Sequence, residues 1–283
     1  MATPQRPALV VALALVVAVA LVAGCSRAVE GIPVSGSANS SSTSPSSSRF
    51  PSGAPIHSGD CVSAAGFTVV DCARPHEFEV YRFTALPTDF PAAYPTPAGL
   101  LPKFEPQCRA GLTGYVGSPD VDASRLREFV YWPSAQSWNA GQRWTLCAAV
   151  EIGPDDRPLR RTGALNGALR GGLGQFQSCT EEPPSEGTLR VVPCDEPHRG
   201  EAVPGVLVLG APTDPPFTAE QANAVAEPHC KRSIDAFLKA PGGQPGVHYS
   251  WRYPLPRSWT NGYTSVVCYA ETEVPVTGSL RDH

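Results

Sequence analysis

The sequence predicts an α+β fold: two tandem copies of a disulfide-stapled domain, each a small, mainly antiparallel sheet with a helical segment. The main observation is a repeat, because CARPHEFE at residues 72–79 returns as CDEPHRGE at residues 194–201. The cysteines divide equally between the copies, and both copies show the order strand, strand, helix, strand, strand. Since each copy is long enough for its own core, the pattern favours a tandem over a solenoid.

The chain begins like an exported lipoprotein. Arg6 precedes an apolar stretch over residues 8–23, and LVAGC at residues 21–25 places a cysteine directly after small residues. This pattern predicts a signal peptide at residues 1–24 and lipidation at Cys25. The alternative is an uncleaved transmembrane helix, but a span needs about 20 apolar residues. We therefore expect a lipid-anchored protein, carrying fatty acyl chains such as palmitate, on the extracytoplasmic face of the cell membrane.

A tether follows the lipidated cysteine. Residues 25–57 consist mainly of Ser, Pro, Gly and Ala, a composition that cannot bury enough apolar surface to fold. We expect a disordered spacer there, then the first copy with its linker at residues 58–173 and the second copy at residues 174–283. Linker leucines, including Leu165 and Leu169, favour a linker that docks.

The elements of one copy follow from overlaying the two. Strands are expected at residues 67–72 and 189–194, around residues 80–83 and 203–208, at residues 247–253, and at residues 143–150 and 264–271. Thr218 with Gln221 forms a capping box, and Thr96 before Pro97 is its counterpart. Pro106 and Pro228 are expected to break or kink these helices.

Eight cysteines remain once Cys25 is set aside, and an exported chain favours disulfides. Zinc is the rival interpretation, but no two of the eight have the close spacing of a structural zinc site. Four cysteines in a copy allow three pairings, which the sequence leaves open. The loop lengths favour Cys61 with Cys72, Cys108 with Cys147, Cys179 with Cys194, and Cys230 with Cys268.

These motifs resemble those of the septum-formation-related domain family. The resemblance rests on C-x-x-P-H-x-x-E, a cysteine after a helix, and W-x-x-G-x5-C, and it covers nearly all of the chain after the tether, twice. The second copy departs from the first, with Arg199-Gly200 in place of Glu77-Phe78. The resemblance implies a protein of the cell envelope with a link to septum formation, and it carries over no catalytic residues.

Two repeated pairs could bear chemistry, namely His76 with Glu79 and His198 with Glu201. Positions three apart on a strand face opposite sides, so one surface presents both only if a turn intervenes. We therefore expect the histidine to bond the backbone in the turn after proline. The glutamate is expected on the surface or paired with an arginine. The alternative is a metal or acid/base pair.

The tryptophans are the second set of candidates. Trp138 and Trp259 could stack on glycans, but aromatics that recur at one position in both copies favour a core role. No G-x-S-x-G, S-x-x-K, H-E-x-x-H or P-loop motif occurs in the sequence. We therefore predict no catalytic residue, no metal and no cofactor.

The charge excludes one class of partner. The formal net charge is −4, with 22 Lys and Arg against 26 Asp and Glu, so we expect no nucleic-acid binding. The sequence favours a non-catalytic module that binds envelope or division proteins, or wall polymer, near the membrane. Two alternatives stay open: a cell-wall or lipid hydrolase or metal-dependent enzyme, and a lipoprotein that binds a ligand in an interdomain cleft.

Overall fold

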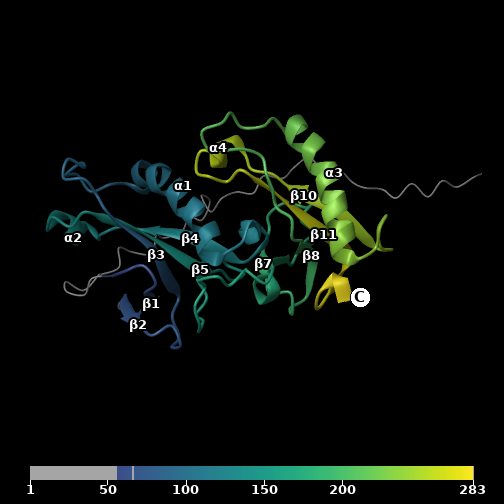
Figure 1. Ribbon diagram of the computed structural model, residues 1–283, viewed down its shortest axis with the longest axis horizontal. Helices are drawn as coiled ribbons and strands as arrows, with labels where there is room; N and C mark the ends of the chain where they lie inside the picture. Colours follow the sequence, from purple (N-terminus) through teal and green to yellow (C-terminus); the bar gives the residue numbers. More distant parts are fainter. Residues whose placement is uncertain (1–55, 66, 283) are drawn as a thin grey trace, which may run out of the picture.

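Two antiparallel sheets make up the protein in the computed structural model, which describes residues 56–65 and 67–282 (Figure 1). The first sheet has the order β2-β1-β3-β5-β4 and the second β10-β11-β8-β6-β7, with β9 paired to β11. The strands of the first copy are β1 (Cys61–Ser63), β2 (Thr68–Val70), β3 (Phe78–Ala85), β4 (Leu126–Tyr131) and β5 (Trp144–Glu151). Those of the second are β6 (Cys179–Thr180), β7 (Val191–Val192), β8 (His198–Ala202), β9 (Leu207–Val208), β10 (Val247–Arg252) and β11 (Ser265–Val276).

One long helix lies beside each sheet (Figure 1). These are α1 (Pro97–Val116) and α3 (Ala219–Leu238). The remaining helical segments are short: the helices α2 (Ala135–Asn139) and α4 (Pro256–Trp259), and the 3-10 turns η1 (Pro119–Ala123), η2 (Gly174–Phe176) and η3 (Leu280–Asp282). The α+β prediction with two tandem copies is confirmed. In the described part of the chain, no helix combines the length and the hydropathy that a bilayer crossing needs. The predicted signal peptide, Cys25 and nearly all of the tether lie outside the described residues.

The caps of the long helices agree with the sequence. Thr96 accepts a hydrogen bond from the backbone of Gly99, and Thr218 and Gln221 form the capping box. The expected break at Pro106 and Pro228 is wrong, because both prolines lie inside continuous helices. In α3 the buried residues recur every four positions on both sides of the proline, so packing outweighs the roughly 3 kcal/mol cost of proline in a helix. They are Ala222, Ala226, Cys230 and Ile234.

The second strand of the second copy also differs from its prediction. Instead of one strand over residues 203–208, the chain forms β8 and then the short β9. Gly205 has a φ of 96°, a left-handed conformation that interrupts the strand between them. The final strands β5 and β11 lie where they were expected, although β11 continues to Val276.

Four disulfides join the eight cysteines of the two copies. Cys61 bonds Cys72, Cys108 bonds Cys147, Cys179 bonds Cys194, and Cys230 bonds Cys268. These are the pairs that the loop lengths favour. The short-loop disulfides join β1 and β6 to the turns that follow β2 and β7, whereas the long-loop disulfides join α1 to β5 and α3 to β11.

The two copies pack against each other, a point that the sequence left open. The linker docks, with Leu165, Leu169 and Leu173 all buried. Residues 176–178 then pair with the end of η1, where Ser178 N–H donates to Ala123 and Arg125 N–H donates to Phe176. A further apolar cluster crosses the junction and is formed by Ala123, Leu173, Ala202, Val267 and Tyr269.

Candidate functional site

Strand register places a glutamate beside the first cysteine of each copy. Cys61 lies opposite Glu79 in the pairing of β1 with β3, and Cys179 lies opposite Glu201 in the pairing of β6 with β8. Residues directly opposite each other on antiparallel strands share a face of the sheet. The carboxylate is therefore held next to the disulfide in both copies.

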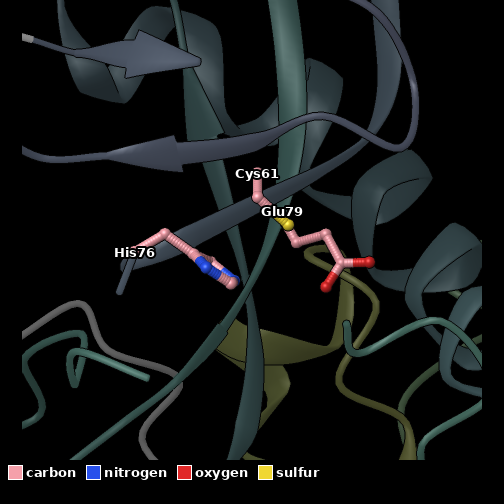
Figure 2. Close-up of side chains that lie close together, drawn as sticks. All are labelled: Cys61, His76 and Glu79. Atoms are coloured by element: carbon pink, nitrogen blue, oxygen red, sulfur yellow. The ribbon is translucent and has the colours of Figure 1, made fainter. Parts of the chain in front are cut away.

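A histidine joins this group in the first copy. His76 forms a β-bridge with Arg161, and a bend at Glu77 separates it from β3. Without this bend, His76 and Glu79 would face opposite sides of the sheet. Nitrogen, sulfur and carboxylate oxygen of His76, Cys61 and Glu79 lie within 4.8 Å of one another. Figure 2 shows the imidazole and the carboxylate converging near the sulfur.

The histidines make the backbone contact expected from the sequence. Nδ1 of His76 lies 2.8 Å from the carbonyl oxygen of Arg74, and Nδ1 of His198 lies 2.8 Å from that of Glu196. Because a carbonyl only accepts hydrogen bonds, Nδ1 carries a hydrogen in both rings. Among the described residues, Nε2 of each ring is buried without a hydrogen-bond partner. In the described part of the chain, one nitrogen of each ring therefore makes a hydrogen bond and the other makes none.

The glutamates do not lie where they were expected. Glu79 is 2% exposed and Glu201 is fully buried, so the prediction of a surface or arginine-paired carboxylate is wrong. Glu79 accepts hydrogen bonds from Leu165 N–H and the Tyr115 hydroxyl. Glu201 accepts them from Leu280 N–H at 2.7 Å and, in place of the tyrosine, from the Ser279 hydroxyl at 2.8 Å. The end of each copy folds back over the sheet, so backbone N–H groups bind these carboxylates where we expected an arginine side chain.

This returning segment is the same in both copies, and we call residues 162–165 and 277–280 the C-terminal latches. Gly163 N–H donates to the carbonyl of Cys72 at 2.7 Å, and Gly278 N–H donates to that of Cys194 at 2.8 Å. The leucine that ends each latch is buried. Each latch therefore ties a cysteine and a glutamate of the repeated motif together.

Burial alters the proton affinity of Glu201. Desolvation raises its pKa above the ordinary value for a glutamate. The hydrogen bonds from Leu280 and Ser279 and the nearby His198 act in the opposite direction. The net shift shows that burial outweighs the hydrogen bonds, so Glu201 holds a proton more readily than an exposed glutamate.

The cysteines decide what metal chemistry the group allows. Cysteine binds metal as a thiolate, and the Cys61 and Cys179 sulfurs are each bonded to a second sulfur. In the disulfide form, the ligand set is reduced to an imidazole nitrogen and a carboxylate in the first copy. This donor set is too small for the three or four protein ligands of a zinc site.

The repeated tryptophans lie in the core. Trp138 is fully buried and donates its ring N–H to Ala92, and Trp259 is 1% exposed and donates to Ala211. Because their ring faces are covered, they offer no stacking platform to a glycan. The packing interpretation is the one that fits this burial.

A buried ionic cluster at the junction of the copies was missed by sequence reasoning. Arg109 of α1 pairs with Asp122 and, at 3.1 Å, with Glu128. It also donates to the carbonyl of Gly262 in the second copy at 3.1 Å and stacks on the Tyr263 ring at 3.9 Å. The only signal was a difference between copies, since Lys231 occupies the position of Arg109. That difference does not predict the hydrogen bond from Arg109 to Gly262, which lies 153 residues further along the chain.

Glu105 lies at the edge of this cluster. Burial and then the charge of Glu128 raise its pKa to about 7, and the Tyr263 hydroxyl and Arg109 reduce the shift. Tyr263 donates to Glu128 at 2.7 Å and lies 3.4 Å from Glu105. The junction therefore contains a carboxyl group that titrates near neutral pH.

Comparison with known proteins agrees with the repeat. The septum formation family matches residues 36–129 and again residues 103–268. The chain belongs to this family. It is also 29% identical over 233 residues to the uncharacterized membrane proteins Rv3835 and MT3943 of two Mycobacterium tuberculosis strains, H37Rv and CDC 1551. That match covers 75% of this chain and 51% of each relative, so the chain spans about half their length. No solved structure matches.

Proposed function

We propose that this protein is a lipid-anchored, non-catalytic module of the cell envelope that serves septum formation or the cell wall by binding a partner. The partner is an envelope or division protein, or wall polymer. The observation that carries this proposal is burial of the repeated polar pairs. His76, Glu79, His198 and Glu201 are at most 2% exposed, so no polymer or lipid substrate can contact them.

The alternative of a hydrolase or metal-dependent enzyme needs an open reactive set. Instead, both glutamates and His76 lie beside a disulfide, and the glutamates are bonded to the C-terminal latches. Zinc analysis of the purified full chain, with His76→Ala and His198→Ala, separates the two functions. Stoichiometric zinc in the native chain that is lost in these variants would favour the enzyme.

The alternative of a ligand site between the copies needs a junction that opens. Contacts across this junction include the buried Arg109 and Tyr263, together with backbone hydrogen bonds. Such contacts favour a fixed orientation of the copies. The binding role is therefore better assigned to the outer surface.

Phe83 is the best place to test that surface. It is 45% exposed at β3, and its ring stacks on the partly buried Trp144 with a centroid distance of 5.9 Å, so the first copy presents an aromatic side chain on a supported surface. A photoreactive amino acid at position 83, irradiated in cells, should capture one reproducible neighbour. The matched control is position 208, where Val208 is 58% exposed in the second copy. Equal capture at both positions would contradict a binding surface on the first copy.

A further inference from the structure

The four disulfides fall into two kinds by exposure. Cys72 and Cys194 are partly exposed, and each is bonded to a fully buried cysteine, Cys61 or Cys179. The other kind is buried on both sides, with exposures of 5% or less for Cys108, Cys147, Cys230 and Cys268. Only the short-loop disulfides therefore include a residue with solvent-exposed surface, and we expect a thiol in solution to reach them before the long-loop ones.

The buried side of each short-loop disulfide faces a titratable group. A Glu79 oxygen lies within 4.8 Å of the Cys61 sulfur, and a Glu201 oxygen lies within 4.8 Å of both the Cys179 and Cys194 sulfurs. The imidazole of His76 is part of the first group (Figure 2). Its Nε2 is a buried polar atom without a hydrogen-bond partner among the described residues. The buried Cys61 sulfur therefore has a carboxyl group and an imidazole as close neighbours.

We infer that Cys61–Cys72 and Cys179–Cys194 are thiol–disulfide exchange sites for a protein dithiol, with Glu79 and Glu201 carrying the proton of the buried sulfur. This activity goes beyond the binding role, because it needs no contact with the outer surface of the sheet. This activity explains why a buried glutamate lies beside the short-loop disulfide in both copies. A disulfide that only stabilises the fold needs no carboxyl group beside it.

The reaction balances as follows in the first copy. A thiolate of the incoming dithiol attacks the Cys72 sulfur, the Cys61–Cys72 bond breaks, and its electron pair leaves on the Cys61 sulfur. That thiolate takes a proton from the Glu79 carboxyl beside it, and Glu79 regains one of the two protons that the incoming dithiol releases. The second thiol of the partner, as thiolate, then attacks the partner's sulfur in the mixed disulfide, and Cys72 leaves as a thiolate that takes the second proton from solvent. The partner is oxidised to a disulfide, and the two cysteines are reduced to thiols.

The backbone holds both cysteines in place when the bond is broken. Cys61 belongs to β1, which is paired with β2 on one side and β3 on the other. Cys72 is held by the hydrogen bond from Gly163 of the latch, and Cys194 by the one from Gly278. The two thiols therefore stay adjacent, as reversible exchange requires.

Redox titration of the full chain tests this inference. The native protein is equilibrated with mixtures of reduced and oxidised dithiothreitol, and its free thiols are alkylated and located by mass spectrometry. Cys61, Cys72, Cys179 and Cys194 should become alkylated reversibly, while the other four cysteines stay protected until denaturant is added. Loss of all four disulfides together, at the rate of global unfolding, would overturn the inference.

Glu79→Gln and Glu201→Gln test the role of the carboxyl group, and each copy serves as the control for the other. Each variant should slow exchange at its own short-loop disulfide at least about tenfold and flatten the pH dependence of that rate. The disulfide of the other copy should be unchanged. Unaltered rates and pH profiles in folded variants would contradict the proton-carrying role.

If Glu79→Gln and Glu201→Gln do not fold, two cysteine variants test the access of thiols to the short-loop disulfides. Cys61→Ser leaves Cys72 as a free thiol, and Cys147→Ser leaves Cys108 as one. Cys72 should react with the aromatic disulfide DTNB in the native chain many times faster than Cys108. Equal reactivity would overturn the inference, because it would remove the difference in access on which exchange depends.

Discussion

At the scale of single residues, Glu79 and Glu201 combine two tasks. Each accepts a backbone hydrogen bond from the C-terminal latch of its copy, and each lies beside a disulfide. An unpaired buried carboxylate is costly, so the latch donors are what make this burial possible. The sequence showed the repeated glutamate but not its backbone donors, because these lie 86 residues away in the first copy and 79 in the second.

The latch glycines provide a prediction at this scale. Gly163 and Gly278 have φ values of 82° and 88°, where any other L residue is strained. Gly163→Ala and Gly278→Ala should each lower the free energy of unfolding by about 1 to 2 kcal/mol. Urea denaturation of the purified chain measures this change.

Gly171→Ala is the matched control for the latch glycines. Gly171 is exposed in the linker, has no left-handed φ, and leaves open space for a methyl group. Its substitution should leave stability unchanged or raise it slightly. An equal loss in all three variants would mean that the latch conformation is not the cause.

At the scale of elements, the helices show where local rules stop. The capping residues Thr96 and Thr218 act as the sequence indicates, because a cap depends on three or four neighbouring residues. Pro106 and Pro228 do not act as the sequence indicates, because each helix is kept continuous by the line of buried residues that packs against its sheet. Strand β8 likewise ends where Gly205 turns the chain, and a run of valines alone gave no sign of this.

Replacing Pro228 in α3 should stabilise the protein. Pro228 removes one N–H from the interior of α3, so Pro228→Ala should restore a hydrogen bond and raise the free energy of unfolding by about 1 to 3 kcal/mol. Pro97→Ala is the control, because Pro97 is in the first turn of α1, where proline is tolerated. Thermal unfolding followed by circular dichroism compares the two. A loss of stability in Pro228→Ala would show that the proline itself fits α3.

At the scale of the whole molecule, the junction packs the two homologous copies against each other. Two side chains at its centre, Arg109 and Tyr263, occupy positions where the copies differ, and Arg109 bonds the backbone of the repeated Gly262. The contact between the copies therefore depends on side chains that the repeat does not share.

Removing the central arginine of the junction should be strongly destabilising. Arg109→Ala would leave the buried Glu128 and the partly buried Asp122 without their cation, at a cost of about 3 to 5 kcal/mol. Lys231→Ala changes the equivalent residue of the second copy, which forms an exposed pair with Glu227, and should cost about 1 kcal/mol or less. Chemical denaturation compares the two variants. Similar losses would contradict the structural role of the junction.

The junction should also respond to pH through Glu105. Its pKa is raised to about 7 in the folded chain, so the folded state binds a proton that the unfolded state releases. This contribution is fully present below the ordinary pKa of a glutamate and is lost as the pH rises through 7. Stability should fall by up to about 3 kcal/mol between pH 5 and pH 8.

Two glutamine variants isolate this effect. Glu105→Gln resembles the protonated form and should remove that part of the pH dependence. Glu227→Gln, at the equivalent exposed position, should leave the pH dependence as it is in the unaltered chain. Unfolding curves over this pH range make the comparison, and identical profiles for all three proteins would exclude Glu105 as the source.

The sequence by itself determined the repeat, the α+β class, the helix caps and the residues that stand out in each copy. These follow from spacing and from interactions between near neighbours. Only the tertiary structure decided that His76 and Glu79 converge on a disulfide, that the linker docks and that Arg109 joins the copies. Those contacts connect residues far apart in the chain, and their energies depend on burial, which a linear pattern does not specify.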